Sequence, residues 1–277
     1  MDVMLLLKAA VMGVVEGLTE FLPVSSTGHL ILAGSVLGLK GETTKLFEVV
    51  IQSGAILAIV SLYIQRLWRT VTGLASDPQA QKFAINVILG FIPAAVMGVL
   101  FIKTIKAVLF NPFVVAAGFI VGGLIMLWVE ARQKRQGEAL QVASVDEIGW
   151  KQALGVGLLQ CVAMVPGVSR SGATIIGGMV LGLNRRTATE FSFFLALPVL
   201  VGAATLDLLK HGHLLTANDV PFFAVGLLFS FVSAWVCVRW LVRYVAQHNF
   251  VGFAWYRIAF GLFILLTGSM GLIQWAD

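Results

Sequence analysis

The chain has 277 residues, of which 58% are hydrophobic and only 12% are charged, with a formal net charge of +5. Soluble domains carry about 25% charged residues, so this composition excludes an ordinary soluble fold and predicts a polytopic membrane protein. The positive charge suits anionic lipid surfaces, and no basic stretch is interleaved with aromatic residues, so the expected partners are membrane lipids and no nucleic acid.

The first element, residues 3–39, is predicted to be a re-entrant hairpin of two short helices. Neither half is long enough to span a bilayer comfortably. Pro23 ends or kinks the first helix, and Ser25 and Ser26 are expected to form the N-cap of a second helix that begins near Thr27. Irregular backbone at membrane depth is tolerated only where it is buried in protein or lines a wet cavity. The hairpin is therefore expected to dip into the protein interior and return.

Six apolar segments are long enough for membrane-spanning helices, three in each half of the chain. In the first half they cover residues 46–67, 83–102 and 113–129. The polar stretch 130–151 is predicted to be a solvated loop that separates a first repeat, residues 1–145, from a second, residues 146–277. In the second half, a hairpin at residues 150–183 precedes spans at 191–209, 220–242 and 252–273.

The two halves are related by an internal repeat. Shifting the sequence by 144 positions places Ser25 on Ser169 and keeps the glycines in register without gaps. Because each half holds a hairpin and three spans, the second repeat is predicted to be inverted, with the two hairpin tips meeting near the midplane. The expected fold class is an all-α polytopic membrane protein with six spanning helices and two re-entrant hairpins. The repeated small residues Gly34 and Gly38 fit either a homodimer contact or internal packing.

The distribution of Lys and Arg predicts the orientation, because cytoplasmic loops carry an excess of these residues. One side of the predicted topology holds Arg66, Arg69, Lys82, Arg132, Lys134, Arg135, Lys151, Arg185, Arg186, Arg239 and Arg243. The other side holds Lys8, Lys40, Lys45, Lys103, Lys106 and Lys210. The first side is expected to be cytoplasmic, which leaves both termini and the mouth of the first hairpin outside.

Residues 16–29 read Glu-Gly-Leu-Thr-Glu-Phe-Leu-Pro-Val-Ser-Ser-Thr-Gly-His and lie between apolar runs. Glu16 and Glu20 are four residues apart and share a helix face, so they can hold Mg²⁺ or Ca²⁺ or act as a general base. The alternative is a structural pair satisfied by hydroxyls or an arginine. Ser26, at a helix N-terminus beside a base, can attack phosphorus or serve as a plain N-cap, and Ser25 competes for either role.

Further candidate residues lie in the first stretch, in the span that follows it and in the last span. His29 can donate a proton to a leaving phosphate or activate a serine, against the alternative of a satisfied core histidine. Thr27 adjoins the serines, and Gln52 follows Glu48 by four residues, so both are weaker candidates for phosphate binding. Arg257, inside the last span, requires a partner or a wet interface.

Residues 165–174 read Val-Pro-Gly-Val-Ser-Arg-Ser-Gly-Ala-Thr, again between apolar runs. The fixed donors of Arg170 suit bidentate phosphate binding, and the alternative is a structural ion pair with Glu16 or Glu20; both can hold in the empty site. Hydroxyls and amides in this stretch are expected to supply further donors to phosphate oxygens. These donors are Ser169, Ser171, Gly172 and Thr174.

An acid pair, a serine, a histidine, an arginine and two helix N-termini together fit phosphoryl transfer, in which positioning and charge stabilisation supply most of the catalysis. The rival hypothesis is a transporter or flippase of a lipid phosphate, because inverted repeats with broken helices are also transporter architecture. A carrier needs anion donors but no nucleophile, which favours the enzyme. A structural scaffold would leave the buried acids and Arg170 unexplained.

Residues 16–29 and 166–174 resemble the two signature motifs of the bacterial undecaprenyl-diphosphate phosphatases, the bacitracin-resistance family. Length, hydropathy and motif spacing resemble that family from end to end. The resemblance implies hydrolysis of undecaprenyl diphosphate to undecaprenyl phosphate and inorganic phosphate, which recycles the lipid carrier for cell-wall synthesis and gives bacitracin resistance. It also implies a divalent metal, a location in the bacterial cytoplasmic (inner) membrane, and a site open to the periplasmic side.

The resemblance also assigns roles by motif position. Glu16 and Glu20 would bind the metal or serve as base, and Ser26 would be the nucleophile. His29 would assist proton transfer, and Arg170 would clamp the diphosphate. The division of labour among the serine, the histidine and the glutamates stays open at this point.

Overall fold

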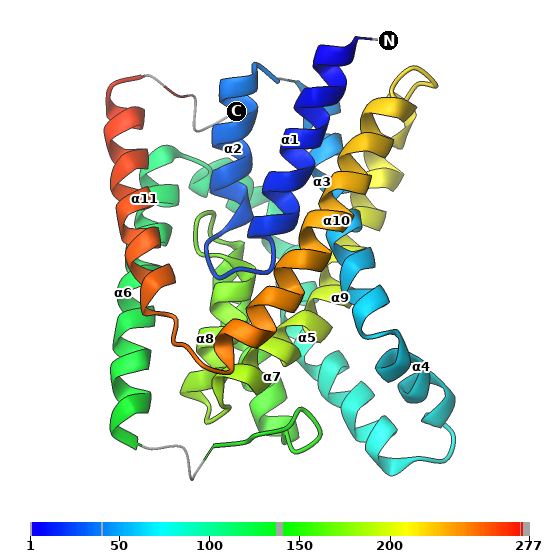
Figure 1. Ribbon diagram of the computed structural model, residues 1–277, viewed down its shortest axis with the longest axis vertical. Coiled ribbons are helices and arrows are strands. Elements are labelled where there is room, and N and C mark those ends of the chain that lie inside the picture. The colour runs from blue at the N-terminus through cyan, green and yellow to red at the C-terminus, as the bar shows by residue number, and fades with distance from the viewer. Residues whose placement is uncertain (1, 40, 137–140, 272, 274–277) are drawn as a thin grey trace.

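The computed structural model describes residues 2–39, 41–136, 141–271 and 273, and its regular elements are helices. Within these residues six helices are long and apolar enough to cross a membrane. They are α3 (Glu42–Leu62), α5 (Pro78–Leu109), α6 (Pro112–Gln136), α9 (Arg185–His211), α10 (Val220–Val245) and α11 (Val251–Ser269). The all-α class and the six predicted spanning helices are confirmed, and Figure 1 shows α6 and α11 on the left and α3, α9 and α10 on the right.

The first spanning helix begins and ends earlier than predicted. The span at residues 46–67 was expected to be continuous, but α3 ends at Leu62, Tyr63 breaks the helix, and α4 (Ile64–Gly73) leaves in a new direction (Figure 1). Ile64, Trp68 and Val71 are exposed at helical spacing on α4. One apolar face on a helix rich in polar residues is typical of a helix that lies along a membrane surface.

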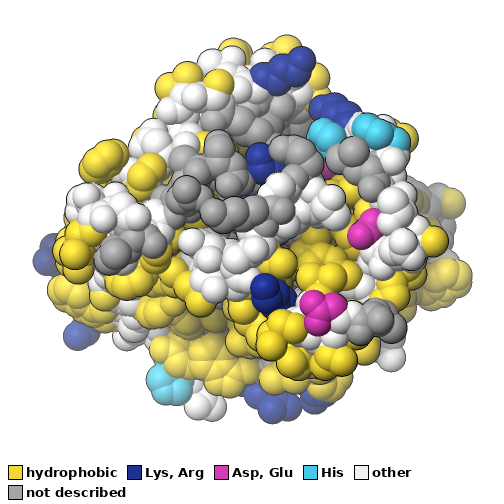
Figure 2. Space-filling model, turned by 90° about the horizontal axis from the view of Figure 1, so that it is seen from above, with side chains coloured by type: hydrophobic (Ala, Val, Ile, Leu, Met, Phe, Trp, Pro, Cys, Tyr) yellow, Lys and Arg dark blue, Asp and Glu magenta, His cyan; other side chains and the backbone are white. Residues whose placement is uncertain are grey.

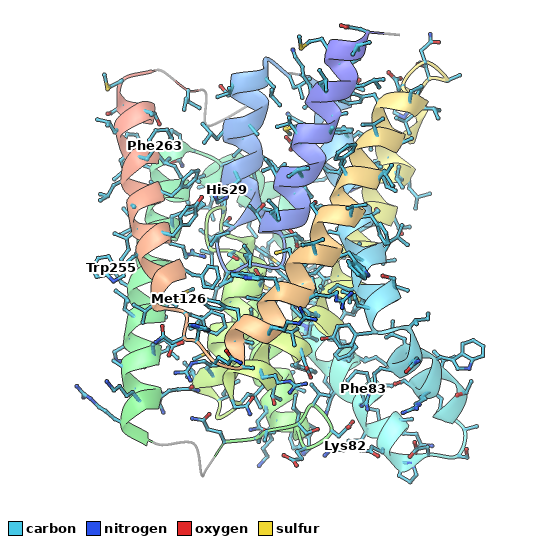
Figure 3. The ribbon with its side chains drawn as sticks, in the orientation of Figure 1. His29, Lys82, Phe83, Met126, Trp255 and Phe263 are labelled. Atoms are coloured by element: carbon cyan, nitrogen blue, oxygen red, sulfur yellow. The ribbon has the colours of Figure 1, made fainter. Side chains whose placement is uncertain are left out.

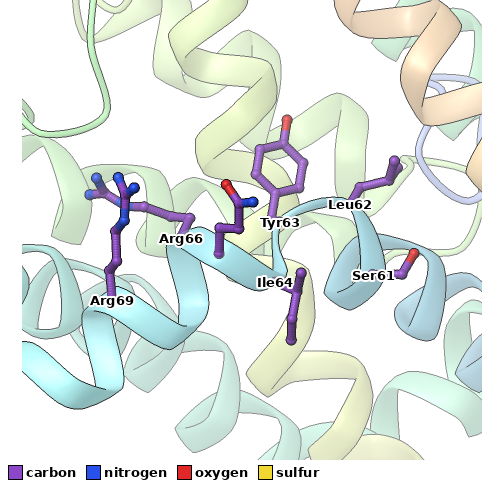
Figure 4. Close-up of a pocket in the computed structure, with 7 residues that line it drawn as sticks. Ser61, Leu62, Tyr63, Ile64, Arg66 and Arg69 are labelled. Carbon is purple, nitrogen blue, oxygen red and sulfur yellow. The ribbon is translucent and has the colours of Figure 1, made fainter.

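A hollow of about 450 Å³ lies at the bend between α3 and α4 (Figure 4). Its lining consists of Ser61, Leu62, Tyr63, Ile64, Gln65, Arg66 and Arg69. None of these is a predicted site residue. Arg66 also forms an ion pair with Asp146, which joins this bend to the chain that precedes α7.

The prediction that residues 130–151 form a solvated loop is wrong for Glu130. α6 continues to Gln136, and Glu130 is only 5% exposed. Its carboxylate accepts hydrogen bonds from Arg185 at 2.5 Å and from the backbone N–H of Phe250 at 2.8 Å. A buried charge is tolerated when it is paired and hydrogen-bonded in this way. Glu130 therefore ties the beginnings of α9 and α11 to α6.

Two pairs of shorter helices occupy the positions of the predicted hairpins. They are α1 (Val3–Thr19) with α2 (Ser26–Leu37), and α7 (Trp150–Gln160) with the 3₁₀ turn η1 (Cys161–Met164) and α8 (Arg170–Val180). α1 packs against α10, and α7 packs against α5. A Cβ at Gly13 would lie 2.3 Å from the carbonyl oxygen of Gly226, and one at Gly157 would lie 2.4 Å from that of Gly90. The segments that join α1 to α2 and α7 to α8 are called the first and the second break below. These close backbone contacts hold both breaks inside the helix bundle.

Candidate active site

Both helix breaks end on a serine in the same unusual conformation. Ser25 has φ 69° and ψ 101°, and Ser169 has φ 74° and ψ 119°; among the described residues no other non-glycine has positive φ. Such a conformation costs about 1–3 kcal/mol and persists only where the surroundings enforce it. Ser169 Oγ accepts from the N–H of Gly172 at 3.0 Å, whereas Ser25 makes no side-chain cap. The expected capping role is therefore wrong for the Ser25 side chain, and α2 begins at Ser26.

Glu20 joins the two sequence motifs. Its Oε2 accepts a hydrogen bond of 2.6 Å from Ser26 Oγ, and its Oε1 accepts one of 3.0 Å from Nη2 of Arg170. Glu20 and Ser26 are 6% and 9% exposed. A short bond from a hydroxyl to a carboxylate is the arrangement in which the acid can accept the proton of an attacking serine. The structure thus places a serine hydroxyl, a carboxylate and a guanidinium in contact.

Arg170 has further contacts on α9 and in the first break. Its Nη1 donates to the carbonyl of Ser192 at 3.0 Å, and its guanidinium carbon lies 5.7 Å from the centre of the Phe21 ring. The hydroxyls of Thr174 and Ser192 are 2.6 Å apart. Nε of Arg170 is buried without a hydrogen-bond partner, so it remains available to an anion. Sequence reasoning missed Ser192. The internal repeat offered a signal, because the shift of 144 positions places Ser192 on the polar residue Glu48.

The hydroxyls and amide that follow the second break are largely occupied by the protein itself. Ser171 Oγ donates to the carbonyl of Leu22 at 2.7 Å and lies 3.1 Å from Ser169 Oγ. The N–H of Gly172 already donates to Ser169. Ser171 therefore connects the two breaks, and the predicted role of these groups in phosphate binding stays a prediction.

His29 has hydrogen-bond partners other than Ser26 and Glu20. Its Nδ1 is 2.7 Å from the carbonyl oxygen of Ser25, and its Nε2 is 2.6 Å from the hydroxyl of Tyr256. The imidazole is nearly parallel to the Phe260 ring, with 4.4 Å between ring centres. Figure 3 shows His29 on α2, in the half of the molecule where α1 begins. Since both ring nitrogens have partners, the base in contact with Ser26 is Glu20. Sequence reasoning missed Tyr256, because an aromatic residue in an apolar span resembles a residue of the hydrophobic core.

Glu16 supplies an unsatisfied carboxylate beside this cluster. It is fully buried on α1, and neither of its oxygens has a hydrogen-bond partner. Its charge interacts with those of Glu20, Glu48 and Arg170. Within the described residues, no group of three or more His, Cys, Asp or Glu is placed to hold a metal alone. Mg²⁺ is commonly held by one or two carboxylates together with substrate phosphate oxygens, and the glutamate pair fits that donor set.

The two weaker candidates lie on the helices around the cluster. Thr27 directly follows Ser26 on α2, and Gln52 lies one turn after Glu48 on α3; both are half-buried. None of the contacts described above involves either side chain, so their roles stay predictions.

Comparison with known proteins identifies relatives along the whole chain. The model of the family described as "Bacitracin resistance protein BacA" matches residues 9–263. The undecaprenyl-diphosphatase of Acidovorax ebreus (strain TPSY) is 58% identical over 277 residues, which cover 100% of both chains. The undecaprenyl-diphosphatase of Polaromonas naphthalenivorans (strain CJ2) is 56% identical over 277 residues, again 100% of both chains. The chain therefore belongs to the bacitracin resistance protein BacA family.

Proposed function

We propose that this chain is a membrane phosphatase that hydrolyses undecaprenyl diphosphate to undecaprenyl phosphate and inorganic phosphate. This activity recycles the carrier lipid for cell-wall synthesis and gives bacitracin resistance. The full-length relatives that bear the name undecaprenyl-diphosphatase support the substrate. The observation that carries the chemistry is the contact of Ser26 and Arg170 with the two oxygens of Glu20.

The reaction follows from these contacts. Ser26 Oγ attacks the terminal phosphorus, and its proton passes to Oε2 of Glu20 across 2.6 Å. The bond from that phosphorus to the bridging oxygen breaks, and undecaprenyl phosphate leaves. Water then attacks the phosphorus of the phosphoserine, the bond between Oγ and phosphorus breaks, and inorganic phosphate leaves while Ser26 regains its proton from Glu20. Arg170 stabilises the charge on the transferring group, a contribution typically worth about 10²-fold or more in rate.

His29 has a separate role in this proposal. Because Glu20 is in contact with the serine, His29 is assigned an assisting role in proton transfer, separate from that of the base for Ser26. Its hydrogen bonds to Ser25 and Tyr256 orient the ring for that role. The proposed base for Ser26 is Glu20, because its Oε2 accepts the hydrogen bond from Ser26 Oγ.

Mg²⁺ or Ca²⁺ is the proposed cofactor. Glu16, whose oxygens are buried and unpartnered, is the main ligand, and Glu20 is the second. When bound, the ion supplies positive charge that neutralises the diphosphate. The same arrangement argues against a carrier, because transport gives no role to a serine in contact with a base.

We also propose that both breaks are re-entrant hairpins in two inverted repeats, residues 1–145 and 146–277. The matched backbone angles of Ser25 and Ser169 support the repeat. The helix packing also supports the repeat. The first helix of the first half, α1, packs on α10 of the second half, and the first helix of the second half, α7, packs on α5 of the first. Figure 1 is consistent with tips that meet inside the bundle.

The proposed location is the bacterial cytoplasmic membrane, with the site open to the periplasmic side. α4 and the start of α7 lie at the end opposite the start of α1 (Figure 1), in agreement with the predicted separation of the basic residues. The end where α1 begins carries mainly hydrophobic side chains, with scattered charges (Figure 2). A homodimer remains a prediction: within the chain, the closest atoms to a Cβ at Gly34 lie 3.9 Å away, and Gly38 has the positive φ of a helix end.

Phosphate release from undecaprenyl diphosphate by the detergent-purified protein tests the proposal, with and without a chelator. We expect metal-dependent release by the wild type and loss of at least about 10²-fold in Glu20→Gln. Absence of release under every divalent metal would overturn the phosphatase proposal. Movement of undecaprenyl phosphate across vesicle membranes by a hydrolysis-dead Ser26→Ala variant would instead revive the carrier hypothesis.

A further inference from the structure

The largest fully buried side chain among the described residues is that of Arg257, which the proposed reaction does not use. Arg257 lies on α11 and is 1% exposed. Its neighbour Trp255 is exposed and points away from the bundle (Figure 3), so α11 turns its polar residue inward. Burying an arginine costs several kcal/mol unless its donors are satisfied. What satisfies this guanidinium therefore indicates its role.

The donors of Arg257 all reach backbone carbonyls. Nη1 donates to Pro23 at 2.9 Å, and Nη2 lies 3.0 Å from the carbonyl of Gly167 and 2.9 Å from that of Val168. Nη2 also contacts the carbonyl of Gly118 at 2.8 Å on α6. Carbonyls in a helix break have no partner within their own helix and require a donor when they are buried. One guanidinium thus satisfies the first break, the second break and α6 together.

These carbonyls directly precede the reacting groups. Pro23 is two residues before Ser25, and Val168 is the residue before Ser169. Each of these serines has positive φ and starts the helix whose first residue is Ser26 or Arg170. Any shift of the bound carbonyls would rotate the backbone that aims the nucleophile and the cation at Glu20.

Room for the guanidinium comes from glycine on the facing helix. A Cβ at Gly122 of α6 would lie 2.2 Å from Nη2 of Arg257. A Cβ at Gly172 of α8 would lie 3.2 Å from Nη1. The cation is therefore fixed by shape as well as by hydrogen bonds.

We propose that Arg257 is a positioning residue of the reaction: it binds the backbone of both helix breaks and holds Ser26 and Arg170 in register on Glu20. The catalytic part of this inference rests on the proposed phosphatase function. The binding of the two breaks to each other does not, and it is measurable without substrate.

Two variants disturb this contact in different ways. Arg257→Lys keeps the charge but replaces the planar fork with a single ammonium that cannot reach both breaks. Gly122→Ala keeps Arg257 and displaces its guanidinium. The matched controls are Arg239→Lys, at an exposed arginine on α10, and Gly98→Ala on α5, where the nearest atom to a Cβ is 3.9 Å away.

Backbone hydrogen exchange by mass spectrometry is the first measurement. We expect faster exchange in Arg257→Lys and Gly122→Ala for peptides that contain residues 20–28 and for those that contain residues 165–172. Peptides from α10 and both control proteins should exchange as in the wild type. Unchanged exchange in either break, or faster exchange throughout the chain, would overturn the proposal.

Steady-state kinetics are the second measurement. We expect kcat for phosphate release to fall on the order of 10²-fold in both variants, with KM changed by less than about threefold, because the loss concerns alignment. Guanidinium ion at low millimolar concentration should restore part of the activity of Arg257→Ala. Full kcat in both variants would overturn the positioning role. No release by the wild type, with the exchange effect intact, would overturn the phosphatase proposal and leave the contact between the breaks established.

Discussion

The hydroxyl oxygen of Tyr256 lies 2.6 Å from Nε2 of His29, and the two rings are parallel within 8°. Since the carbonyl of Ser25 can only accept, Nδ1 of His29 carries the proton in that contact. Nε2 of a neutral imidazole then accepts from the phenol. The carbonyl of Ser25 thus fixes the tautomer of His29, and Tyr256 fixes the orientation of the ring.

Replacement of Tyr256 by Phe should lower kcat by about 10-fold, because the ring stack stays while the hydrogen bond to His29 is lost. The double variant Tyr256→Phe/His29→Ala should be no slower than His29→Ala alone, since both changes remove one unit. The rates of the wild type, the two single variants and the double variant measure this coupling. Additive losses would show that the two side chains act independently. Tyr244→Phe is the control, because Tyr244 stacks on His248 outside the site.

Ser26→Ala should abolish phosphate release and the trapping of phosphate on the protein. Ser25→Ala should retain most activity, because the Ser25 side chain makes no capping bond and does not contact Glu20. Rapid quench with radiolabelled terminal phosphate measures the covalent intermediate in each variant. Wild-type activity in Ser26→Ala, or a phosphoprotein that survives the substitution, would remove Ser26 from the nucleophile position.

The two glutamates should respond differently to metal. Glu16→Gln is expected to raise the metal concentration for half-maximal activity at least about 10-fold, because it replaces the carboxylate that has no other partner. Glu20→Gln is expected to lower kcat even at saturating metal, because it removes the base. Titration of activity with Mg²⁺, and of binding with Mn²⁺ by electron paramagnetic resonance, separates the two effects. Equal metal dependence in both variants would contradict this division.

Glu130→Ala should destabilise the fold by about 3 kcal/mol, because it removes the buried carboxylate that accepts from both Arg185 and the N–H of Phe250. Thermal unfolding in detergent checks this value. Glu190→Ala is the matched control: its partner Arg186 is largely exposed, so the loss should stay below about 0.5 kcal/mol. Equal effects of the two substitutions would show that burial of Glu130 does not matter for stability.

Composition and hydropathy were sufficient to predict the six spanning helices, because length and apolarity are what a bilayer requires. The cost of buried charge likewise identified Glu20 and Arg170, which the structure brings into contact. The bend at Tyr63 was missed, because the apolar pattern continues through it.

The finer geometry of the site had no sequence signal. No sequence rule assigns a positive φ to a serine such as Ser25. That backbone conformation directs the hydroxyl of Ser26 to the carboxylate of Glu20. Tyr256 and Ser192 lie in apolar spans where an aromatic ring or a small hydroxyl resembles core. Arg257 was recognised as needing a partner, but its partners are backbone carbonyls, which every residue possesses.

The ion pair between Arg170 and Glu20 has a consequence for turnover. An arriving phosphate and Glu20 compete for the same cation, so the ion pair weakens the affinity for substrate and for released phosphate alike. In the proposed reaction, Glu20 becomes neutral once it has taken the proton of Ser26, and the competition ends. The full charge of Arg170 then acts on the phosphoryl group at the moment of transfer, so binding is tighter in the transition state than before or after it. Weak retention of the product and strong stabilisation of the transition state thus arise from one contact.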